Sequence, residues 1–313
     1  MLIALKLTEG TGMTEGHTGS AVLRRQLGRN LRTLRGRARL TVRAAATKLD
    51  WSETKMWRIE TGHTTLRALD VQAMCMTYGA PADLTQTLMD LATEAKSCAG
   101  WHSPNRIAVL GNAYTGLEEA AHDLATYESD LVPGLLQTRD YARAIICAHY
   151  PAIAEDDLAG RVRLRMERQA ILTRATDPTP LRVALSETAV RYPVGGPEAM
   201  ARQLAHLVYM SGLSHISLRV VPFAAGPHPG VVTGPFMMQR FRPAADGTDT
   251  EPPVVYADGY VGGRYFDRAV DVERYEAAWA GIWAAALDEQ ATQHILAAAA
   301  RSHAEPSVTM TRG

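Results

Sequence analysis

The stretch from Leu40 to Gly62, LTVRAAATKLDWSETKMWRIETG, determines the fold that we expect for the N-terminal part of the chain. Thr41 and Ser52 each precede a run with apolar residues at helical spacing, and their hydroxyls suit the N-cap position of a helix. The stretch therefore predicts two short helices joined by a short turn. In the second helix, Met56 and Ile59 are expected to point inward.

This pair of helices is typical of a helix-turn-helix. The small residues Ala44, Ala45 and Ala46 would let the second helix cross the first closely, leaving its other face free to enter the major groove of DNA, which is roughly 12 Å wide. The side chains left outside are mostly polar and suit base edges and phosphates. They are Ser52, Glu53, Thr54, Lys55, Trp57 and Arg58. The alternative is a helical hairpin with no role in DNA binding.

Further helices are expected on both sides of this stretch. Leucines recur every three or four positions from Leu23 to Leu34 and predict an amphipathic helix. Two more helices are expected at about 66–78 and 84–91. The five helices together predict a compact all-α module at 21–97.

The charge distribution favours a nucleic-acid partner for this module alone. The whole chain has a net charge of zero, but eleven Lys/Arg and only three Asp/Glu lie between Ala21 and Leu66, which gives this segment +8. The rest of the chain must then carry −8. A basic module joined to a larger acidic one is expected when one of two domains meets phosphate. The alternative is a solvated, arginine-rich helix face without a partner.

Beyond residue 98, helical and strand-like patterns are interleaved, which predicts an α+β domain at 110–303. Helices are expected at 117–127, 138–149, 155–173, 197–210, 270–286 and 288–301. Strands are expected at 181–185, 216–221, 236–241 and 254–256, with a turn or bulge at 259–263. The predicted fold is therefore multidomain, with an all-α five-helix helix-turn-helix module followed by an α+β regulatory domain.

The remaining segments are interpreted as a disordered arm at 1–20, a linker at 98–109 and a tail at 304–313. No apolar run approaches the ~20 residues of a membrane span, and the first residues lack the features of a signal peptide. The three cysteines, Cys75, Cys98 and Cys147, are far apart and form neither a disulfide framework nor a metal site. We therefore expect a cytoplasmic protein with no membrane partner.

The pair Leu40-Thr41 and the run Arg58-Ile59-Glu60-Thr61-Gly62 resemble two signatures of the lambda-repressor-like (XRE-type) helix-turn-helix family. In that family a Leu-Thr pair opens the second helix, and Arg-Ile-Glu-x-Gly ends the third. The resemblance implies that Glu53, Thr54 and Trp57 read bases. It also implies that backbone phosphates are held by Thr41, Arg43, Ser52, Lys55 and His63. Arg58 and Glu60 are a mixed case, since the family often uses them in an ion pair that supports the fold, and Arg58 can also touch DNA.

Two residues depart from the family pattern. Val42 stands where glutamine is common, which removes one usual polar contact with DNA. Trp57 replaces a small polar residue, so it either contacts a thymine methyl group or packs against a partner.

Four motifs of the larger domain are YESDLVPGLLQTRDYAR at 127–143, RYPVGGP at 191–197, VPFAAGPHPG at 221–230 and GPF at 234–236. They are similar to passages in actinobacterial XRE regulators of the WhiJ-like group, and the resemblance spans about 21–295. Such proteins pair a helix-turn-helix with a C-terminal domain of unassigned function. The resemblance further implies a small partner protein encoded nearby, an antitoxin-like role in some members, and links to differentiation and antibiotic production in Streptomyces-like bacteria.

The sequence contains no Gly-x-Ser-x-Gly elbow, phosphate-binding Gly-x-x-x-x-Gly-Lys loop or His-Glu-x-x-His motif, so we expect no catalytic residue, metal or cofactor. A loop at 222–234, rich in Gly, Pro and His, suits a pocket for a small effector. The candidate ligand-binding residues are Phe223, His228, Phe236, Tyr256 and Arg264. The alternative is an ordinary core with exposed turns.

These observations predict a sequence-specific transcriptional regulator that binds double-stranded DNA as a homodimer. A small molecule or a small protein bound to the C-terminal domain would control it. The alternative is an antitoxin-like protein-interaction module that autoregulates through its helix-turn-helix. A third possibility is an enzyme regulated through a DNA-binding arm.

Overall fold

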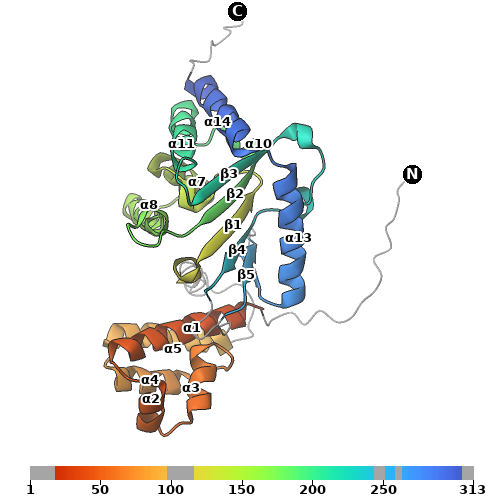
Figure 1. Cartoon of the computed structure of the whole chain (residues 1–313). Helices are drawn as coiled ribbons and strands as arrows, with labels where there is room; N and C mark the ends of the chain where they lie inside the picture. Colours follow the sequence, from red (N-terminus) through yellow and green to blue (C-terminus); the bar gives the residue numbers. More distant parts are fainter. Residues whose placement is uncertain (1–17, 97–115, 243–250, 258–262, 305–313) are drawn as a thin grey trace, which may run out of the picture. The chain divides into compact units, whose positions relative to one another are not determined.

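The computed structural model describes residues 18–96, 116–242, 251–257 and 263–304. The chain divides into two compact units, Met1–Arg106 and Ile107–Gly313. The first unit is helical and the second combines helices with a sheet (Figure 1). Several predicted segments lie wholly or largely outside the described residues: the arm up to residue 17, the linker at 98–109, the turn at 259–263 and the tail from residue 305.

The N-terminal unit contains the five predicted helices. They are α1 (Thr18–Arg37), α2 (Val42–Leu49), α3 (Glu53–Glu60), α4 (Ala68–Tyr78) and α5 (Ala82–Lys96). Both predicted N-caps are confirmed. The Thr41 hydroxyl accepts a hydrogen bond from the N–H of Ala44 at 3.1 Å, and the Ser52 hydroxyl accepts one from the N–H of Lys55 at 3.1 Å. Each of these bonds satisfies a backbone donor that a helix start leaves free.

Helix α1 packs against α3, α4 and α5, and its predicted leucine stripe is buried from Leu23 to Leu34. At Gly28, this helix meets the end of α3 backbone to backbone. A Cβ added to Gly28 would lie 2.5 Å from the carbonyl oxygen of Ile59 and 2.7 Å from that of Glu60. Only glycine therefore allows the two helices to approach this closely.

The C-terminal unit is built on one six-stranded sheet with the strand order β3-β2-β1-β4-β5-β6. Its strands are β1 (Asp123–Glu128), β2 (Leu181–Ser186), β3 (Ile216–Val221), β4 (Phe236–Arg240), β5 (Val254–Ala257) and β6 (Arg264–Phe266). Strands β1, β2 and β3 are parallel, whereas β4, β5 and β6 run antiparallel to their neighbours. The predicted α+β class is thus confirmed, with a mixed sheet.

Helices cover both faces of this sheet (Figure 1). The helices of this unit are α7 (Arg139–His149), α8 (Glu155–Arg168), α9 (Ala170–Thr173), α10 (Glu187–Arg191), α11 (Pro197–Met210), α12 (Gly230–Thr233), α13 (Ala269–Ala285) and α14 (Glu289–Ala304), and α8 packs on the outside of α7. Helices α7, α11 and α14 bury one face in the larger core, and α13 packs against the other with Val272, Trp279 and Ile282. Within the described parts of the chain, every helix is too short or too polar to span a bilayer.

One prediction in this unit was wrong. The segment 117–127, expected as a single helix, is helical only within 116–120, and the chain then enters β1. Residues Leu124 to Tyr127 are buried, and each of them pairs with β2 on one side and β4 on the other. Long-range pairing therefore outweighs local helical preference at this position. The three-residue strand β6 was not predicted, since it is too short for a periodic signal.

The loop between β1 and α7 is held by three glutamine side chains. Gln203 of α11 donates to the carbonyl of Leu136 at 2.7 Å and accepts from the N–H of Thr138 at 2.6 Å. Gln169 donates to the carbonyls of Gly134 and Gln137, at 3.0 and 2.7 Å. The Gln137 side chain in turn donates to the carbonyl of Val132 at 2.7 Å. The part of the motif at 132–138 thus forms a largely buried loop, in which glutamine side chains satisfy five backbone groups.

We expect Gly28→Ala to destabilise the N-terminal unit by about 1–3 kcal/mol, because the added methyl would be driven into backbone atoms that cannot rotate away. Gly36 lies in the same helix, and its Cβ position has no atom within 4 Å. Gly36→Ala should therefore stabilise the unit by about 0.5 kcal/mol through helix propensity. Calorimetric unfolding of both variants checks the pair, and a shift in the same direction for both would contradict the close approach at Gly28.

We expect Gln203→Met to cost the C-terminal unit about 2–4 kcal/mol, because the substitution leaves the carbonyl of Leu136 and the N–H of Thr138 without their partner. Methionine keeps the length of the side chain and is flexible enough to fill the same space. The matched control is Gln290→Met on the exposed start of α14. Urea unfolding gives the two differences, and equal values would show that the amide of Gln203 contributes nothing.

Candidate nucleic-acid interface

Helix α3 is anchored on one side and open on the other. Its inward residues Met56 and Ile59 are 0% and 1% exposed, as predicted. The residues predicted to read DNA lie on its start and its open side. Ser52, Glu53, Thr54, Trp57 and Arg58 are exposed, and Lys55 is half-buried.

The end of α3 is fixed by a buried ion pair. Arg35 of α1 donates through Nε and Nη2 to the two carboxylate oxygens of Glu60, at 2.6 and 2.8 Å. The side chains of Arg35 and Glu60 are only 12% and 5% exposed, and the hydrogen bond to Glu60 raises the pKa of Arg35. The supporting ion pair of Glu60 is thus made with Arg35, while Arg58 is exposed to solvent.

The predicted phosphate contacts at the helix starts remain available for DNA. Thr41 and Ser52 use a lone pair to cap α2 and α3, so each hydroxyl still has its hydrogen to donate to a phosphate oxygen. Arg43 is exposed on the first turn of α2. These donors lie close to the positive ends of two helix dipoles, where anions are favoured.

Lys55 is held in place by Trp51, a residue that the sequence analysis did not select. Its Nζ lies 3.4 Å from the centroid of the Trp51 ring, which is a close cation–π contact. The signal for this contact was the i,i+4 spacing of the two residues. Beside Lys55 is an open hollow of about 310 Å³, lined by Ser52, Thr54, Lys55, Arg58, Ile59, Thr64, Thr65, Leu66 and Asp70. Four of the predicted DNA-binding residues thus converge on one concave surface.

Trp57 and His63 form a second aromatic contact. Their rings are stacked, with centroids 5.1 Å apart and planes 17° apart. Thr61 links the two residues, because its hydroxyl donates to the carbonyl of Trp57 at 2.7 Å and lies 2.8 Å from Nδ1 of His63. Thr61 was not predicted as a site residue, since its role depends on how the chain turns after α3.

The candidate ligand-binding residues of the C-terminal unit are brought together only in part. Phe236 is buried on β4 directly opposite Tyr127 of β1, and the Tyr127 ring is also in edge contact with His228 at 5.8 Å. Burial raises the pKa of Tyr127 and lowers that of His228. Arg264 is exposed, and its position on β6 lies two strands from Phe236, across Ala257.

The other two candidates lie elsewhere. Tyr256 is the neighbour of Phe236's partner Ala257 along β5, so it points to the opposite face of the sheet, where it contacts Tyr265. Phe223 lies after β3 and is 62% exposed, with its N–H bonded to Glu187 at 2.8 Å. An aromatic residue that was not predicted, Tyr275 of α13, does pack beside Phe236, with ring centroids 4.9 Å apart.

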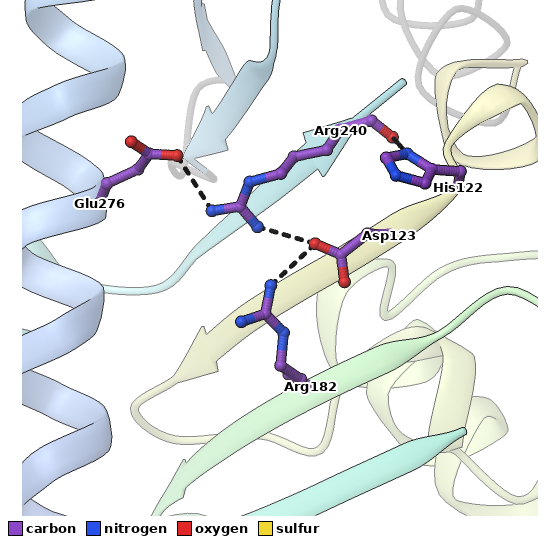
Figure 2. A network of polar contacts seen from close by, with 5 residues as sticks. All are labelled: His122, Asp123, Arg182, Arg240 and Glu276. Atoms are coloured by element: carbon purple, nitrogen blue, oxygen red, sulfur yellow. Dashed lines mark hydrogen bonds and ion pairs between the residues drawn. The ribbon is translucent and has the colours of Figure 1, made fainter. Parts of the chain in front are cut away.

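A polar network that the sequence did not indicate ties three strands to α13 (Figure 2). One carboxylate oxygen of Asp123 on β1 accepts from Arg182 of β2 and from Arg240 of β4, both at 2.8 Å. Arg240 also donates to Glu276 of α13 at 3.0 Å, and its carbonyl lies 3.0 Å from Nδ1 of His122. Arg182 and Arg240 lie 59 and 117 positions after Asp123 in the sequence, so no local pattern could have indicated these contacts.

Two family models match the chain. One is described as a helix-turn-helix domain and covers residues 26–88, which include α2, α3 and the exposed face described above. The other is described as a domain of unknown function (DUF5753) and covers residues 112–298, which include the whole sheet. No curated protein and no solved structure matches the chain. Since the second match spans more than half of its length, the chain belongs to the DUF5753 family and carries a helix-turn-helix domain before it.

Proposed function

We propose that this protein is a sequence-specific transcriptional regulator that inserts α3 into the major groove of double-stranded DNA. The observation that carries the proposal is the division of α3 into a fully buried side, Met56 and Ile59, and an exposed side rich in hydrogen-bonding groups. A helix of this kind needs one face for its own core and one for the base edges.

The contacts in this proposal follow the exposure of the side chains. Glu53, Thr54 and Trp57 would face the bases. Phosphates would be held by Thr41, Arg43, Ser52, Lys55 and His63. Arg58, which lines the hollow beside Lys55, would also lie near the DNA. The net charge of +8 between Ala21 and Leu66 supports this assignment, because cations near phosphate release bound counterions.

We also propose that the protein acts as a homodimer and belongs to the WhiJ-like group of XRE-type regulators. The support is the general use of paired half-sites about 34 Å apart by helix-turn-helix proteins, and the four motifs of the larger domain. The C-terminal unit would supply much of the contact between the two copies.

An effector of the C-terminal unit would bind near the carboxyl ends of β1, β2 and β3. Phe236 and Arg264 lie at this edge of the sheet, because β4 and β6 begin where β1 ends. The ring of His228 is in contact with Tyr127, near the carboxyl end of β1. Ligands of open sheets often bind at this edge, next to the strand where the order reverses. To control DNA binding, the effector must bind two arrangements of the protein with different affinity.

The second candidate function is an antitoxin-like interaction protein, and a specific observation favours it. Three apolar side chains on the connection between β3 and β4 are largely exposed: Phe223 at 62%, Val231 at 69% and Val232 at 90%. Exposed apolar groups that form one contiguous patch are typical of protein contacts, and Val231 and Val232 are adjacent on α12. In this case DNA binding would serve to regulate the protein's own gene.

We expect the double substitution Thr54→Ala/Lys55→Ala to weaken binding to promoter DNA from the protein's own gene neighbourhood by at least about tenfold, because one base contact and one phosphate contact are lost. The slope of log K against log salt concentration should become shallower by about 0.9. Titrations at several salt concentrations measure both quantities.

The matched control is Thr93→Ala/Lys96→Ala, which removes the same two residue types from the exposed side of α5. Equal losses in the two variants would mean that α3 has no special role. Weak and sequence-blind binding by the wild type would instead favour the interaction protein.

If the second candidate function holds, the small protein encoded beside this one should co-purify with the wild type and be lost with Val232→Asp, because a charge would be placed in an apolar contact. Val270→Asp provides the control, since Val270 is also an exposed valine of the same unit, at 50% exposure. Retention of the partner by Val232→Asp would count against this surface.

A further inference from the structure

The exposed Trp57 has a specific part in DNA recognition if α3 reads DNA as proposed above. We propose that Trp57, stacked on His63, selects thymine in the DNA site by contact with the C5-methyl group of that base. The sequence left two roles open for this residue, a thymine contact and a partner contact, and the geometry around it favours the first.

The side chain of Trp57 is both exposed and ordered by its neighbours. It is 55% exposed although it is the largest apolar side chain on α3, and the His63 ring stacks on it at 5.1 Å. An exposed side chain that is already held in one position loses little conformational entropy on binding.

The hydrogen bonds of Thr61 determine how His63 is held. The Thr61 hydroxyl has one hydrogen, and that hydrogen is donated to the carbonyl of Trp57. Nδ1 of His63, 2.8 Å away, must therefore be the donor to the Thr61 oxygen. The imidazole is thus fixed in orientation against the indole.

A rigid indole suits one group in the major groove. The base edges there present hydrogen-bond donors and acceptors, and the methyl group of thymine is the apolar exception. The residues around Trp57 on the open side of α3 include Glu53, Thr54 and Arg58, which are exposed and polar or charged. The centre of a protein–protein contact is usually poor in charged residues, so these neighbours fit a DNA surface better than a protein partner.

The test compares thymine with uracil, which lacks only the C5-methyl group. The full-length protein first selects its preferred DNA from a random-sequence pool. That DNA is then made twice, with thymine or with uracil throughout, and Kd is measured for both at one salt concentration. We expect the wild type to bind the uracil DNA about fourfold more weakly for each methyl group that it buries.

The variants assign this difference to Trp57. Trp57→Ala should bind the two DNAs with about equal affinity, and Thr61→Val should reduce the difference, because His63 is then no longer held against the indole. Leu69→Ala is the matched control, since Leu69 is a large apolar residue of the same unit at 72% exposure, and it should keep the wild-type difference.

Two outcomes would overturn the proposal while leaving the proposed function intact. One is a wild type that selects a sequence but binds its thymine and uracil forms equally. The other is a Trp57→Ala variant that keeps the wild-type ratio between the two Kd values, because the thymine methyl group would then be contacted by another residue. A wild type that selects no sequence at all would overturn the proposed function together with this inference.

Discussion

One guanidinium group, that of Arg35, joins three parts of the N-terminal unit. Its Nε and Nη2 bind Glu60 at the end of α3, and its Nη1 donates to the carbonyl of Leu40 in the turn before α2 at 2.8 Å. A buried charge of this kind is tolerated only when its donors are paired. Because the contact at Gly28 places the same two helices backbone to backbone, α3 has little freedom to rotate. These buried contacts therefore determine the orientation of the exposed side of α3.

In the C-terminal unit, glutamine amides provide most of the hydrogen bonds that hold a comparable loop. Its loop after β1 is largely buried from Val132 to Gln137, so the backbone N–H and C=O groups there need partners. The side-chain amides of Gln169, directly after α8, and Gln203 of α11 provide several of these partners. Burial raises the pKa of the nearby Tyr141 to about 12. The rigid loop lies at the carboxyl end of β1, where Tyr127 and His228 are in contact. Rigidity at this edge of the sheet therefore comes from a hydrogen-bond network of glutamine amides, to which the guanidinium of Arg165 donates through Gln137 at 2.8 Å.

The features that could be predicted from sequence are those with a local cause. The caps at Thr41 and Ser52, the five helices and four of the six strands each depend on residues within a few positions of one another. The larger features that escaped prediction depend on distant residues. Strand β1 requires β2 and β4 as neighbours, and Glu60 finds its partner 25 residues earlier in the chain.

The candidate site divides in the same way. The exposed polar residues of α3 follow from helical periodicity, because a buried stripe at Met56 and Ile59 leaves the other positions outside. The stack of Trp57 on His63 does not follow from periodicity, since it depends on the turn at Thr61 and Gly62. In the C-terminal unit, Tyr256 and Phe236 point to opposite faces because Phe236 pairs with Ala257, and alternation within each strand does not give this register.

The central position of β1 has a consequence for how the protein is made. During synthesis β1, β2 and β3 are complete before β4 exists, so one edge of β1 has unpaired backbone groups until residues 236–240 leave the ribosome. Asp123 likewise lacks its ion-pair partner until Arg240 is synthesised, and the larger core is incomplete until Leu296 of α14 is synthesised. The N-terminal unit has a shorter delay, because its five helices follow one another directly along the chain and α1 meets its last partner, α5, by residue 96. The nascent chain thus carries a finished helical unit while its sheet still has an open edge, the stage at which a chaperone would have most to protect.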